Sequence, residues 1–509
     1  MNKVAKIFSA ATIGLDSYLV EVEVDIGLGL PSFTVVGLPD KAIDESKERI
    51  RAALRNSHIS FPQHRLTINL APADVKKEGP SFDLPMAVGI LVASEQVDNL
   101  DEFKKALFIG ELSLNGELRH VNGILPIVMF AKEQGYERVF VPEINKDEAA
   151  LIKGIEVMPV KTLMELIAHL RSEKLIVSYK VEVREQKKVE DSQYDFAYVC
   201  GQEQAKRALE IAAAGNHNIL LSGPPGSGKT LLARSIVTIL PEMDEDEILE
   251  VTKIHSVAGV LSRENLVIDR PFRSPHHTTS SVALIGGGQW PKPGEISLSH
   301  RGILFMDEFP EFPRNVLEAL RQPLEDGVVT VSRATGSITF PAKFLLVAAQ
   351  NPCPCGFMSD PEKRCTCMPS QIIRYQKKIS GPLLDRIDIH IEVPRVKYEK
   401  LADVTKAESS ENVKKRIESA RALQKKRFEK VKIKTNAEMS SREVREYCKL
   451  EKDAEQIMAK AVESMKLSAR VYHRLLKLAR TIADLEGAPT IKPSHIAEAL
   501  QYRPKEKTY

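Results

Sequence analysis

The chain has 509 residues, of which 43% are hydrophobic and 28% are charged, and its formal net charge is +3. This composition excludes intrinsic disorder, collagen-like repetition and a disulfide scaffold, and the length predicts about three to four domains. No stretch approaches the ~20 apolar residues that a membrane helix needs. Lys6 and Asp16 interrupt the apolar N-terminal segment, so we expect no signal peptide. Together with only six cysteines, this predicts a protein of the reducing cytoplasm.

Residues 1–171 alternate short β-rich runs with helical segments. The runs YLVEVEVDI, RLTINLA and RVFVP predict strands, and DKAIDESKERIRAALRN and DLPMAVGILVASEQV predict helices. This alternation is typical of an α+β domain. Residues 172–195 combine few apolar positions with many charges, which predicts a linker.

Residues 196–395 contain the apolar runs NILLS, GILFMD and FLLVAA, separated by helical segments, which predicts a parallel α/β sheet. Residues 396–509 have helical periodicity almost throughout. From Lys397 onward the chain has 27 basic and 17 acidic residues, a net charge of +10. This excess favours a polyanionic partner, although a solvated helical surface would have the same composition.

A phosphate-binding loop follows the first apolar run of this region. The pattern G-x-x-x-x-G-K-[ST] is matched by Gly223, Pro224, Pro225, Gly226, Ser227, Gly228, Lys229 and Thr230, and Leu231 continues into the helix. The glycines let backbone N–H groups turn toward phosphate oxygens at the N-terminus of that helix. We expect Lys229 to neutralise the β- and γ-phosphates of ATP and the Thr230 hydroxyl to bind Mg²⁺.

Polar residues also follow the next two apolar runs. Asp307 and Glu308 end GILFMDE, and we expect Asp307 to hold Mg²⁺ and Glu308 to polarise the attacking water. Asn351 follows FLLVAAQ and is the candidate for orienting that water. Arg386 in SGPLLDRIDIH is a candidate arginine for a neighbouring subunit's ATP, and a salt bridge with the flanking Asp385 or Asp388 is the alternative.

Four cysteines within fifteen residues predict a metal site. They are Cys353, Cys355, Cys365 and Cys367, in the pattern C-x-C-x9-C-x-C. Four thiolates so close together can enclose one tetrahedral Zn²⁺, although C-x-C is tighter than the usual spacing. We expect a structural zinc that links the loop between the Asn351 strand and the following helix and holds Asn351 in register, with free thiols as the alternative.

Val413–Lys434 has ten basic residues and only two acidic ones, and Ile417, Ala420 and Leu423 supply an apolar seam. The pattern predicts an amphipathic basic helix. Its candidate DNA contacts are Lys425, Lys426 and Arg427. The alternative is a solvent-facing arm that braces the neighbouring helices.

Across nearly its whole length the chain resembles the ComM/YifB group of Mg-chelatase-like AAA+ ATPases. The resemblance rests on VGLPDKAIDESKERIRAAL, CGQEQAKRALEIAAAGNHNILLSGPPGSGKT, RPFRSPHHTTSSVALIGGG, PKPGEISLSHRGILFMDEFPEF and LVAAQNPCPCG, among other segments. It implies an N-terminal domain like the C-terminal domain of Lon protease (residues 1–171), an AAA+ core (196–395) and a helical lid (396–509).

The same resemblance assigns further residues and an assembly. It implies homohexameric rings with ATP between subunits, Val199 and Gln202 beside the adenine, Arg386 as the arginine that reaches the adjacent site, and Arg470 as the nucleotide-sensing arginine of the lid. Arg474, one turn further on, competes for that last role. Two insertions, around Arg270–Lys292 and Gly327–Phe340, point into the channel of related rings. Candidate backbone contacts to a DNA strand are therefore Arg273, Lys292 and Arg333, with packing between modules as the alternative.

The segment KKEGPSFDLPMAVGIL resembles the Lon segment that carries the nucleophilic serine, and Ser81 takes that position. The position of the Lon lysine holds Leu125, which cannot accept a proton. We therefore expect a non-proteolytic domain, because Lys132 lies two helical turns away from that position.

The expected function is a DNA motor. ATP hydrolysis in a hexamer would drive branch migration of single-stranded or branched DNA in recombination or natural transformation, with recombination proteins as partners and no membrane involved. The alternatives are a chelatase-type remodeller of a protein partner and an ATP-dependent Lon-like protease. An ATP-gated scaffold is a further alternative.

Overall fold

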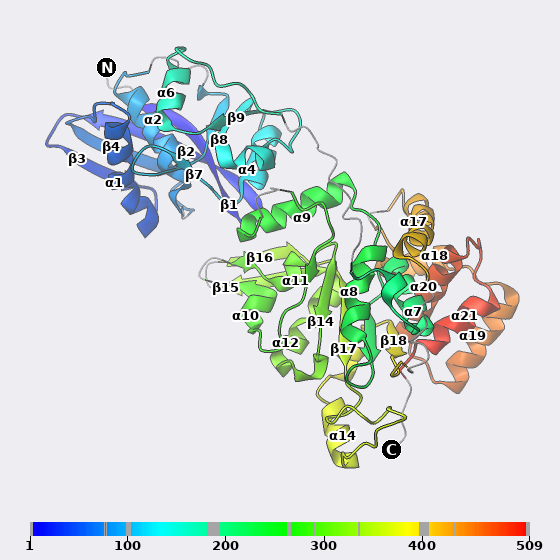
Figure 1. The fold of residues 1–509 in the computed structure, drawn as a ribbon. Coiled ribbons are helices and arrows are strands. Elements are labelled where there is room, and N and C mark those ends of the chain that lie inside the picture. The colour runs from blue at the N-terminus through cyan, green and yellow to red at the C-terminus, as the bar shows by residue number, and fades with distance from the viewer. Residues whose placement is uncertain are drawn as a thin grey trace. The chain divides into compact units, whose positions relative to one another are not determined.

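The computed structural model describes residues 4–75, 77, 79–97, 103–180, 193–261, 266–288, 291–333, 336–396, 407–431 and 433–504. It divides into two compact units, one of residues 1–186 with 248–267 and one of residues 187–247 with 268–509 (Figure 1). Residues 181–192 of the predicted linker lie outside the described residues. The ATPase core and the helical C-terminal region are therefore parts of one compact unit.

The first unit is built on a mixed seven-stranded sheet in the order β3-β4-β2-β1-β5-β8-β9. The strands are β1 (Ala5–Ile13), β2 (Asp16–Gly27), β3 (Ser32–Val36), β4 (Arg65–Ala71), β5 (Ala106–Phe108), β8 (Arg138–Pro142) and β9 (Glu156–Val160). The pairs β1–β2 and β2–β4 are antiparallel, and the other neighbours are parallel. All three predicted strands of this region are confirmed. A short hairpin, β6 (Glu111–Leu112) with β7 (Leu118–Arg119), lies beside the sheet.

Helices cover both faces of this sheet. They are α1 (Lys41–Asn56), α2 (Asp83–Ala93), α4 (Ile124–Glu133), α5 (Lys146–Ala149) and α6 (Leu163–Leu170). The side chain of Asp40 caps α1 by accepting a hydrogen bond from the N–H of Ile43 at 2.9 Å. Because side chains alternate along each strand, one core receives Phe108 and Phe140 and a second receives Leu107 and Val139.

The second unit is built on a five-stranded parallel sheet in the order β11-β14-β17-β10-β18, which confirms the predicted parallel α/β core. Its strands are β10 (Ile219–Ser222), β11 (Phe272–Arg273), β14 (Ile303–Met306), β17 (Leu345–Gln350) and β18 (Ile389–Glu392). All carboxyl ends meet at one edge, so the segments that follow β10, β14 and β17 lie together there.

Helices and short hairpins surround this sheet (Figure 1). They are α7 (Glu203–Gly215), α8 (Lys229–Ile239), α10 (Ser281–Ile285), α11 (Glu295–Leu298), α12 (Arg314–Ala319), α13 (Arg321–Asp326), α14 (Pro369–Gln376), α15 (Gly381–Leu384), β12 (Gly286–Gly287) with β13 (Lys292–Pro293), and β15 (Val328–Arg333) with β16 (Gly336–Pro341). The predicted hairpin around 327–340 is confirmed as β15–β16. Helix α9 (Glu245–Ala258) begins in this unit, and its residues from Ile248 onward belong to the first unit.

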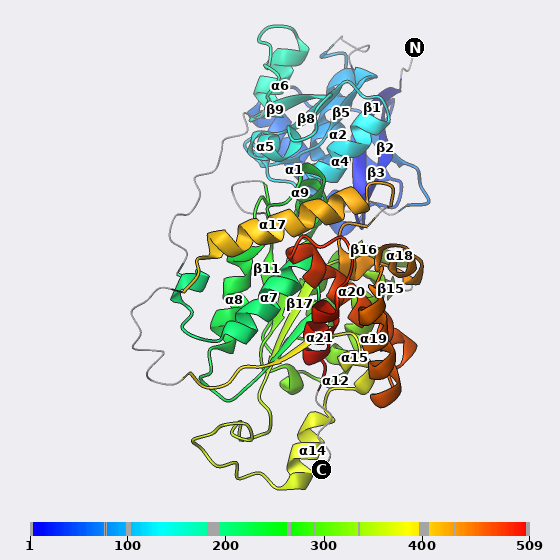
Figure 2. The same ribbon diagram turned by 90° about the vertical axis from the view of Figure 1, so that its right-hand side faces the viewer.

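The C-terminal region is helical, as predicted. Its helices are α17 (Ser410–Arg427), α18 (Ser441–Tyr447), α19 (Lys452–Ser464), α20 (Ala469–Leu485) and α21 (Pro493–Gln501). Figure 2 shows α17 lying across α7 and α8, and its buried residues join the same core as strand β10. None of the described helices is long and apolar enough to cross a membrane.

Two details of the predicted basic helix are wrong. Helix α17 ends at Arg427 rather than at Lys434, because the buried Gln424 binds the N–H of Asn436 at 3.0 Å, where the chain has turned back. The apolar seam also differs, since Leu423 is 41% exposed. The buried positions are Val413, Ile417, Ala420 and Gln424, whose spacing of three to four residues keeps them on one face of the helix.

Candidate functional site: a nucleotide site and a thiolate cluster

The phosphate-binding loop connects β10 to α8 at the carboxyl edge of the parallel sheet. Gly226 and Gly228 have φ angles of +75° and +88°. A Cβ on Gly223 would lie 2.1 Å from the carbonyl oxygen of Val393, just beyond β18. Only glycine fits there, so the motif's first residue is fixed by a close backbone approach as well as by the loop's turns.

The Lys229 side chain lies inside this loop and is 9% exposed. Its ammonium donates hydrogen bonds to the carbonyl oxygens of Gly223 at 2.8 Å and Pro224 at 2.9 Å, and to Oδ1 of Asn351 at 3.3 Å. Burial lowers the pKa of Lys229 below its ordinary value, and the carboxylate of Asp307 opposes that shift. A polyphosphate beside this ammonium would favour its charged form in the same way.

Thr230 and Asp307 meet across the edge of the sheet. The Thr230 hydroxyl donates to Oδ2 of Asp307 at 2.9 Å. Two oxygens bound at right angles to one Mg²⁺ at ~2.1 Å lie about 3.0 Å apart, so this pair fits two adjacent positions of an octahedral site. The two residues predicted to hold magnesium are therefore brought together.

Glu308, the predicted base, has a left-handed backbone conformation with φ of +50°. Its N–H donates to Oδ1 of Asp307 at 2.8 Å, and Nδ1 of His277 lies 3.2 Å from its Oε2. Sequence reasoning missed His277, because it precedes Glu308 by about thirty residues and only the pairing of β11 with β14 brings their strands together.

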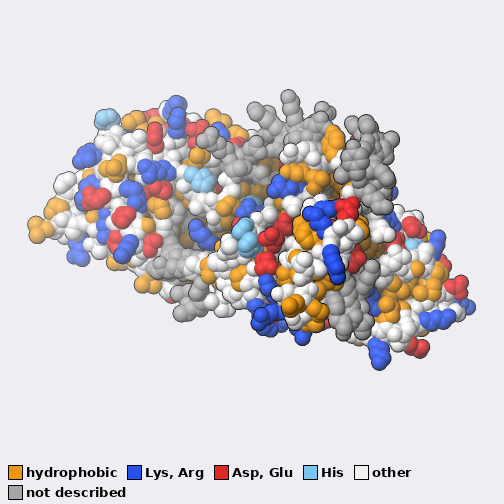
Figure 3. Space-filling view, turned by 60° about the horizontal axis from the view of Figure 1, so that its bottom comes forward, with side chains coloured by type: hydrophobic (Ala, Val, Ile, Leu, Met, Phe, Trp, Pro, Cys, Tyr) orange, Lys and Arg blue, Asp and Glu red, His pale blue; other side chains and the backbone are white. Residues whose placement is uncertain are grey.

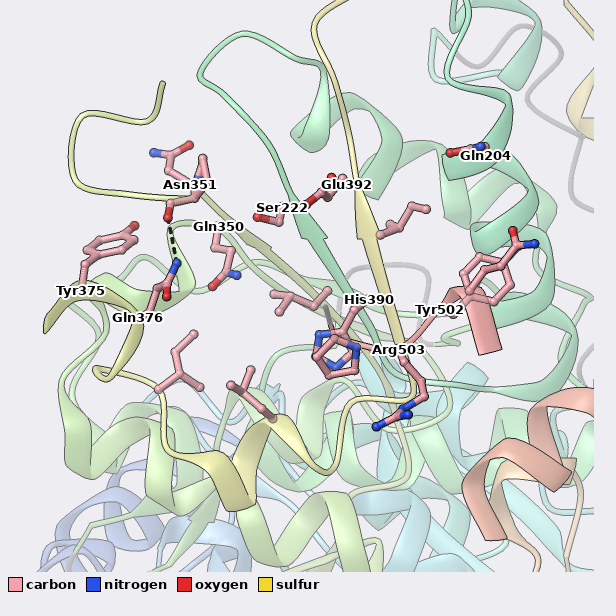
Figure 4. A pocket seen from close by; sticks show the side chains of 17 residues that line it. Gln204, Ser222, Gln350, Asn351, Tyr375, Gln376, His390, Glu392, Tyr502 and Arg503 are labelled. Atoms are coloured by element: carbon pink, nitrogen blue, oxygen red, sulfur yellow. Dashed lines mark hydrogen bonds between the residues drawn. The ribbon is translucent and has the colours of Figure 1, made fainter. Parts of the chain in front are cut away.

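Asn351 lies at the end of β17, beside a pocket of about 570 Å³ (Figure 4). Leu220 of β10 lines this pocket, whereas its neighbour Ile219 points into the core on the opposite face of the sheet. Figure 4 shows Asn351 at one end and Tyr502 and Arg503 at the other. None of residues 223–230 is among the described residues that line it, but Ser222, directly before the phosphate loop, and Asn351 are, so the pocket adjoins the nucleotide site.

The two candidate adenine residues lie just before α7. Gln202 has φ of +62° and donates through Nε2 to the carbonyl oxygens of Pro394 at 2.5 Å and Ser227 at 3.4 Å. It therefore ties this segment to the phosphate loop and to the chain after β18. Val199 is buried in the core of the unit, and Leu231 is 37% exposed on the first turn of α8.

The four clustered cysteines converge as the sequence predicts. All four sulfurs lie within 4.8 Å of one another. The Sγ–Sγ distances are 3.4 Å for Cys353–Cys355, 3.7 Å for Cys353–Cys365 and 3.6 Å for Cys355–Cys365, and Cys367 accepts a hydrogen bond from the N–H of Cys355. Four sulfurs at about 2.3 Å from one tetrahedral zinc lie about 3.8 Å apart, so the donor set fits this metal.

The pKa values of two thiols in the cluster are shifted in opposite directions. Burial raises the pKa of Cys353 to about 12. Burial also acts against ionisation of Cys355, but N–H groups of Phe357 and Thr366 outweigh it and lower the pKa of Cys355 to about 6. The lowered pKa of Cys355 favours its thiolate, the form in which cysteine binds metals.

Arg386, predicted to reach a neighbouring subunit's ATP, and Arg470, predicted to sense nucleotide from the lid, share one carboxylate in this chain. Glu325 of α13 pairs with Arg386, and its Oε1 lies 3.1 Å from Arg470. The salt bridge anticipated for Arg386 exists, but with Glu325 rather than with Asp385 or Asp388. Arg474 is the arginine that lies 3.9 Å from Asp388.

The candidate DNA contacts divide into paired and exposed side chains. Arg273 makes two hydrogen bonds with Glu295, at 2.6 and 2.7 Å. Arg427 pairs with the fully buried Asp484 and donates to Asn436 at 2.9 Å. Exposed positions are occupied by Lys292, Lys425 and Lys426, whereas the side chain of Arg333 lies outside the described residues.

Leu125 and Ser81, the two positions compared with the Lon pair, lie in different elements of the first unit. Leu125 is fully buried in α4, and its N–H donates to Glu148 at 2.9 Å. Ser81 lies in a short 3-10 turn whose carbonyl accepts the N–H of Gly110 at 2.9 Å. No side chain at position 125 can accept a proton from a serine.

Comparisons with known proteins agree with this architecture. The models for "Magnesium chelatase, subunit ChlI", "Subunit ChlI of Mg-chelatase" and "Magnesium chelatase, subunit ChlI C-terminal" match residues 195–401, 22–145 and 407–503. The protein named Competence protein ComM of Haemophilus influenzae is 44% identical over 505 residues, covering 98% of this chain and 97% of that protein. YifB of Escherichia coli is 43% identical over 500 residues, covering 98% and 96%.

A more distant relative is the magnesium-chelatase subunit ChlI of Olisthodiscus luteus, which is 25% identical over 230 residues, 43% of this chain and 61% of that protein. The identity to ComM and YifB extends through both compact units, and the chelatase models cover the nucleotide site and the helical region. The chain therefore belongs to the ComM/YifB family of magnesium-chelatase-like AAA+ ATPases.

Proposed function

We propose that this protein is a ring-shaped ATPase motor that moves on single-stranded or branched DNA and drives branch migration. The observation that carries the ATPase part is the contact set at one sheet edge, in which Lys229 meets Asn351 and Thr230 meets Asp307. The DNA part is supported by full-length similarity to a protein named for competence. Recombination proteins are the expected partners.

Each side chain of the nucleotide site has a distinct task in this proposal. Lys229 would leave its loop carbonyls to bind the β- and γ-phosphates, and Thr230 with Asp307 would hold Mg²⁺, which neutralises charge on the transferred group. Glu308 would accept a proton from the attacking water, and Asn351 would orient that water. The strand order brings all of these groups to one edge of the sheet.

A homohexamer is supported by the surroundings of Arg386 within a single chain. Within one chain, the described polar partners of the Arg386 guanidinium are Glu325 and the carbonyl of Pro382 at 2.7 Å, not the phosphate loop. An arginine that stabilises transition-state charge must therefore come from a neighbouring subunit if Arg386 supplies it. A ring of identical chains would provide one such arginine to every site.

Structural zinc belongs to the same proposal. The four cysteine sulfurs have the separations that tetrahedral coordination requires. Zinc held there has no open position for substrate, so its contribution would be to the local fold rather than to the chemistry.

A second candidate is an ATP-driven remodeller of a protein partner, as in magnesium chelatase. It is favoured by the chelatase models that match residues 195–401 and 407–503. On the face seen in Figure 3, basic and acidic side chains of the described residues are interspersed.

The test is unwinding of three- and four-way DNA junctions by purified protein, with and without ATP, beside a casein-cleavage assay. The motor predicts ATP-dependent branch migration that Glu308→Gln abolishes, with casein left intact. ATP hydrolysis that is indifferent to DNA, with no junction processing, would contradict the motor and favour the remodeller. Casein cleavage would support the protease instead.

A further inference from the structure

The cysteine cluster lies in a long irregular segment directly after Asn351. Residues 352–368 connect β17 to α14 without a helix or strand, and all of them are described. Irregular loops longer than about 12–15 residues are uncommon in compact domains unless something other than secondary structure orders them. At its start the segment is bound to α14 by a long hydrogen bond, 3.5 Å from Nε2 of Gln376 to the carbonyl of Pro352, and at its end Met368 caps that helix. The converging thiolates are the strongest candidate for what orders the segment.

This segment packs against the phosphate loop at Gly356. Gly356 is buried with φ of +83°, and a Cβ there would lie 2.5 Å from Cδ and 2.7 Å from Cγ of Pro225. The N–H of Gly356 donates to the carbonyl of Cys353 at 3.0 Å. The turn that packs on Pro225 is therefore the same turn that presents Cys353 and Cys355 to the cluster.

A second route connects the cluster to the nucleotide site. Cys353, fully buried, follows Asn351 by two residues, and Asn351 contacts the ammonium of Lys229 at 3.3 Å. A shift of the cysteine turn would thus move Pro225 on one side of the loop and Asn351 on the other.

We propose that the metal-bound cysteine cluster is a brace for the phosphate loop, so that metal occupancy sets the affinity for ATP. The proposal rests on the structural zinc proposed above and is independent of any action on DNA. Metal binding replaces the secondary structure that residues 352–368 lack, and it holds Gly356 against Pro225. Without metal the turn loses its order, and the phosphate loop spends only part of its time in the conformation that binds phosphates.

The test uses the full-length protein, from which zinc is removed by a chelator under reducing conditions and then restored. Zinc stoichiometry and the Kd for a fluorescent ATP analogue with Mg²⁺ are measured in each state. If the phosphate loop of the metal-free protein is in its phosphate-binding conformation about a tenth of the time, the Kd for the ATP analogue rises about tenfold. It recovers when zinc is restored. Equal affinity in the two states overturns the brace, as does protein purified without chelator that contains no metal.

A substitution tests the packing of Gly356 on Pro225 separately from metal binding. Gly356→Ala keeps all four thiols but places a methyl group against Pro225 in a strained backbone conformation, so we expect retained zinc and a Kd also raised about tenfold. The matched control is Gly381→Ala, since a Cβ there has no atom within 4 Å. Retained zinc with unchanged affinity in Gly356→Ala refutes the contact. Because neither readout involves DNA, failure of the motor leaves this result intact.

Discussion

Replacing Arg427 with alanine is expected to destabilise the helical lid rather than to remove a DNA contact. Arg427 is 16% exposed and pairs with Asp484, which is fully buried. Removing one partner of a buried ion pair costs about 3–5 kcal/mol, because the other charge is left without compensation. Arg480 at 3.0 Å and Asn436 at 2.8 Å still contact Asp484, so the lower value, about 3 kcal/mol, applies here.

The same helix offers a matched control. Lys426 is exposed one residue earlier on α17, and surface substitutions away from special features change stability by about 0.5 kcal/mol or less. At roughly 2 °C per kcal/mol for a large unit, Arg427→Ala should lower Tm by about 6 °C and Lys426→Ala by about 1 °C or less. For DNA binding we expect the opposite order, with the larger effect in Lys426→Ala. Each lost phosphate contact on a single strand reduces the slope of log affinity against log salt concentration by about 0.7.

The assay is thermal unfolding followed by circular dichroism, with DNA binding measured at several salt concentrations below the lower Tm. A Tm for Arg427→Ala equal to that of wild type, with a reduced salt slope, would falsify the assignment of Arg427 to the lid's interior. It would return this residue to the candidate DNA contacts.

Three further outcomes are expected at the nucleotide site. Lys229→Ala abolishes binding of a fluorescent ATP analogue, whereas Glu308→Gln keeps binding but stops turnover; equal ATPase rates in Glu308→Gln and wild type exclude Glu308 as the base. His277→Ala changes kcat with little effect on KM, because His277 contacts the carboxylate of Glu308, the proposed base; a change confined to KM contradicts that. Arg386→Ala lowers kcat roughly 10³-fold. If neighbouring chains share a site, mixing Arg386→Ala subunits with Lys229→Ala subunits restores part of the ATPase activity. No restoration argues against shared sites.

The charge of the C-terminal region shows how net charge differs from the charge that a surface presents. The +10 excess favoured a polyanionic partner, and five of the nine described basic residues in Val413–Lys434 form ion pairs. Their partners are acidic residues on neighbouring elements and on α17 itself, as in Lys414–Glu242, Lys415–Glu411, Arg416–Glu210, Arg427–Asp484 and Lys434–Asp244. A net charge counts residues, whereas a binding surface depends on which charges remain exposed and unpaired.

The sequence by itself determined the elements whose causes are local. The phosphate loop, the strands that end at Asp307 and Asn351, and the cysteine spacing follow from glycine positions, apolar periodicity and short distances along the chain, and the structure confirms these elements. Helix α17 was also predicted from its periodicity. Its C-terminal end was not, because Gln424 accepts a hydrogen bond from a residue twelve positions further on.

Only the tertiary structure decided which distant residues meet. The pairing of Arg386 and Arg470 on Glu325, the contact of His277 with Glu308 and the packing of Gly356 on Pro225 join residues 31 to 145 positions apart. Such contacts depend on strand order and loop paths, which are set by the packing of whole elements. These long-range contacts cannot be predicted from the residues that adjoin each side chain in the sequence.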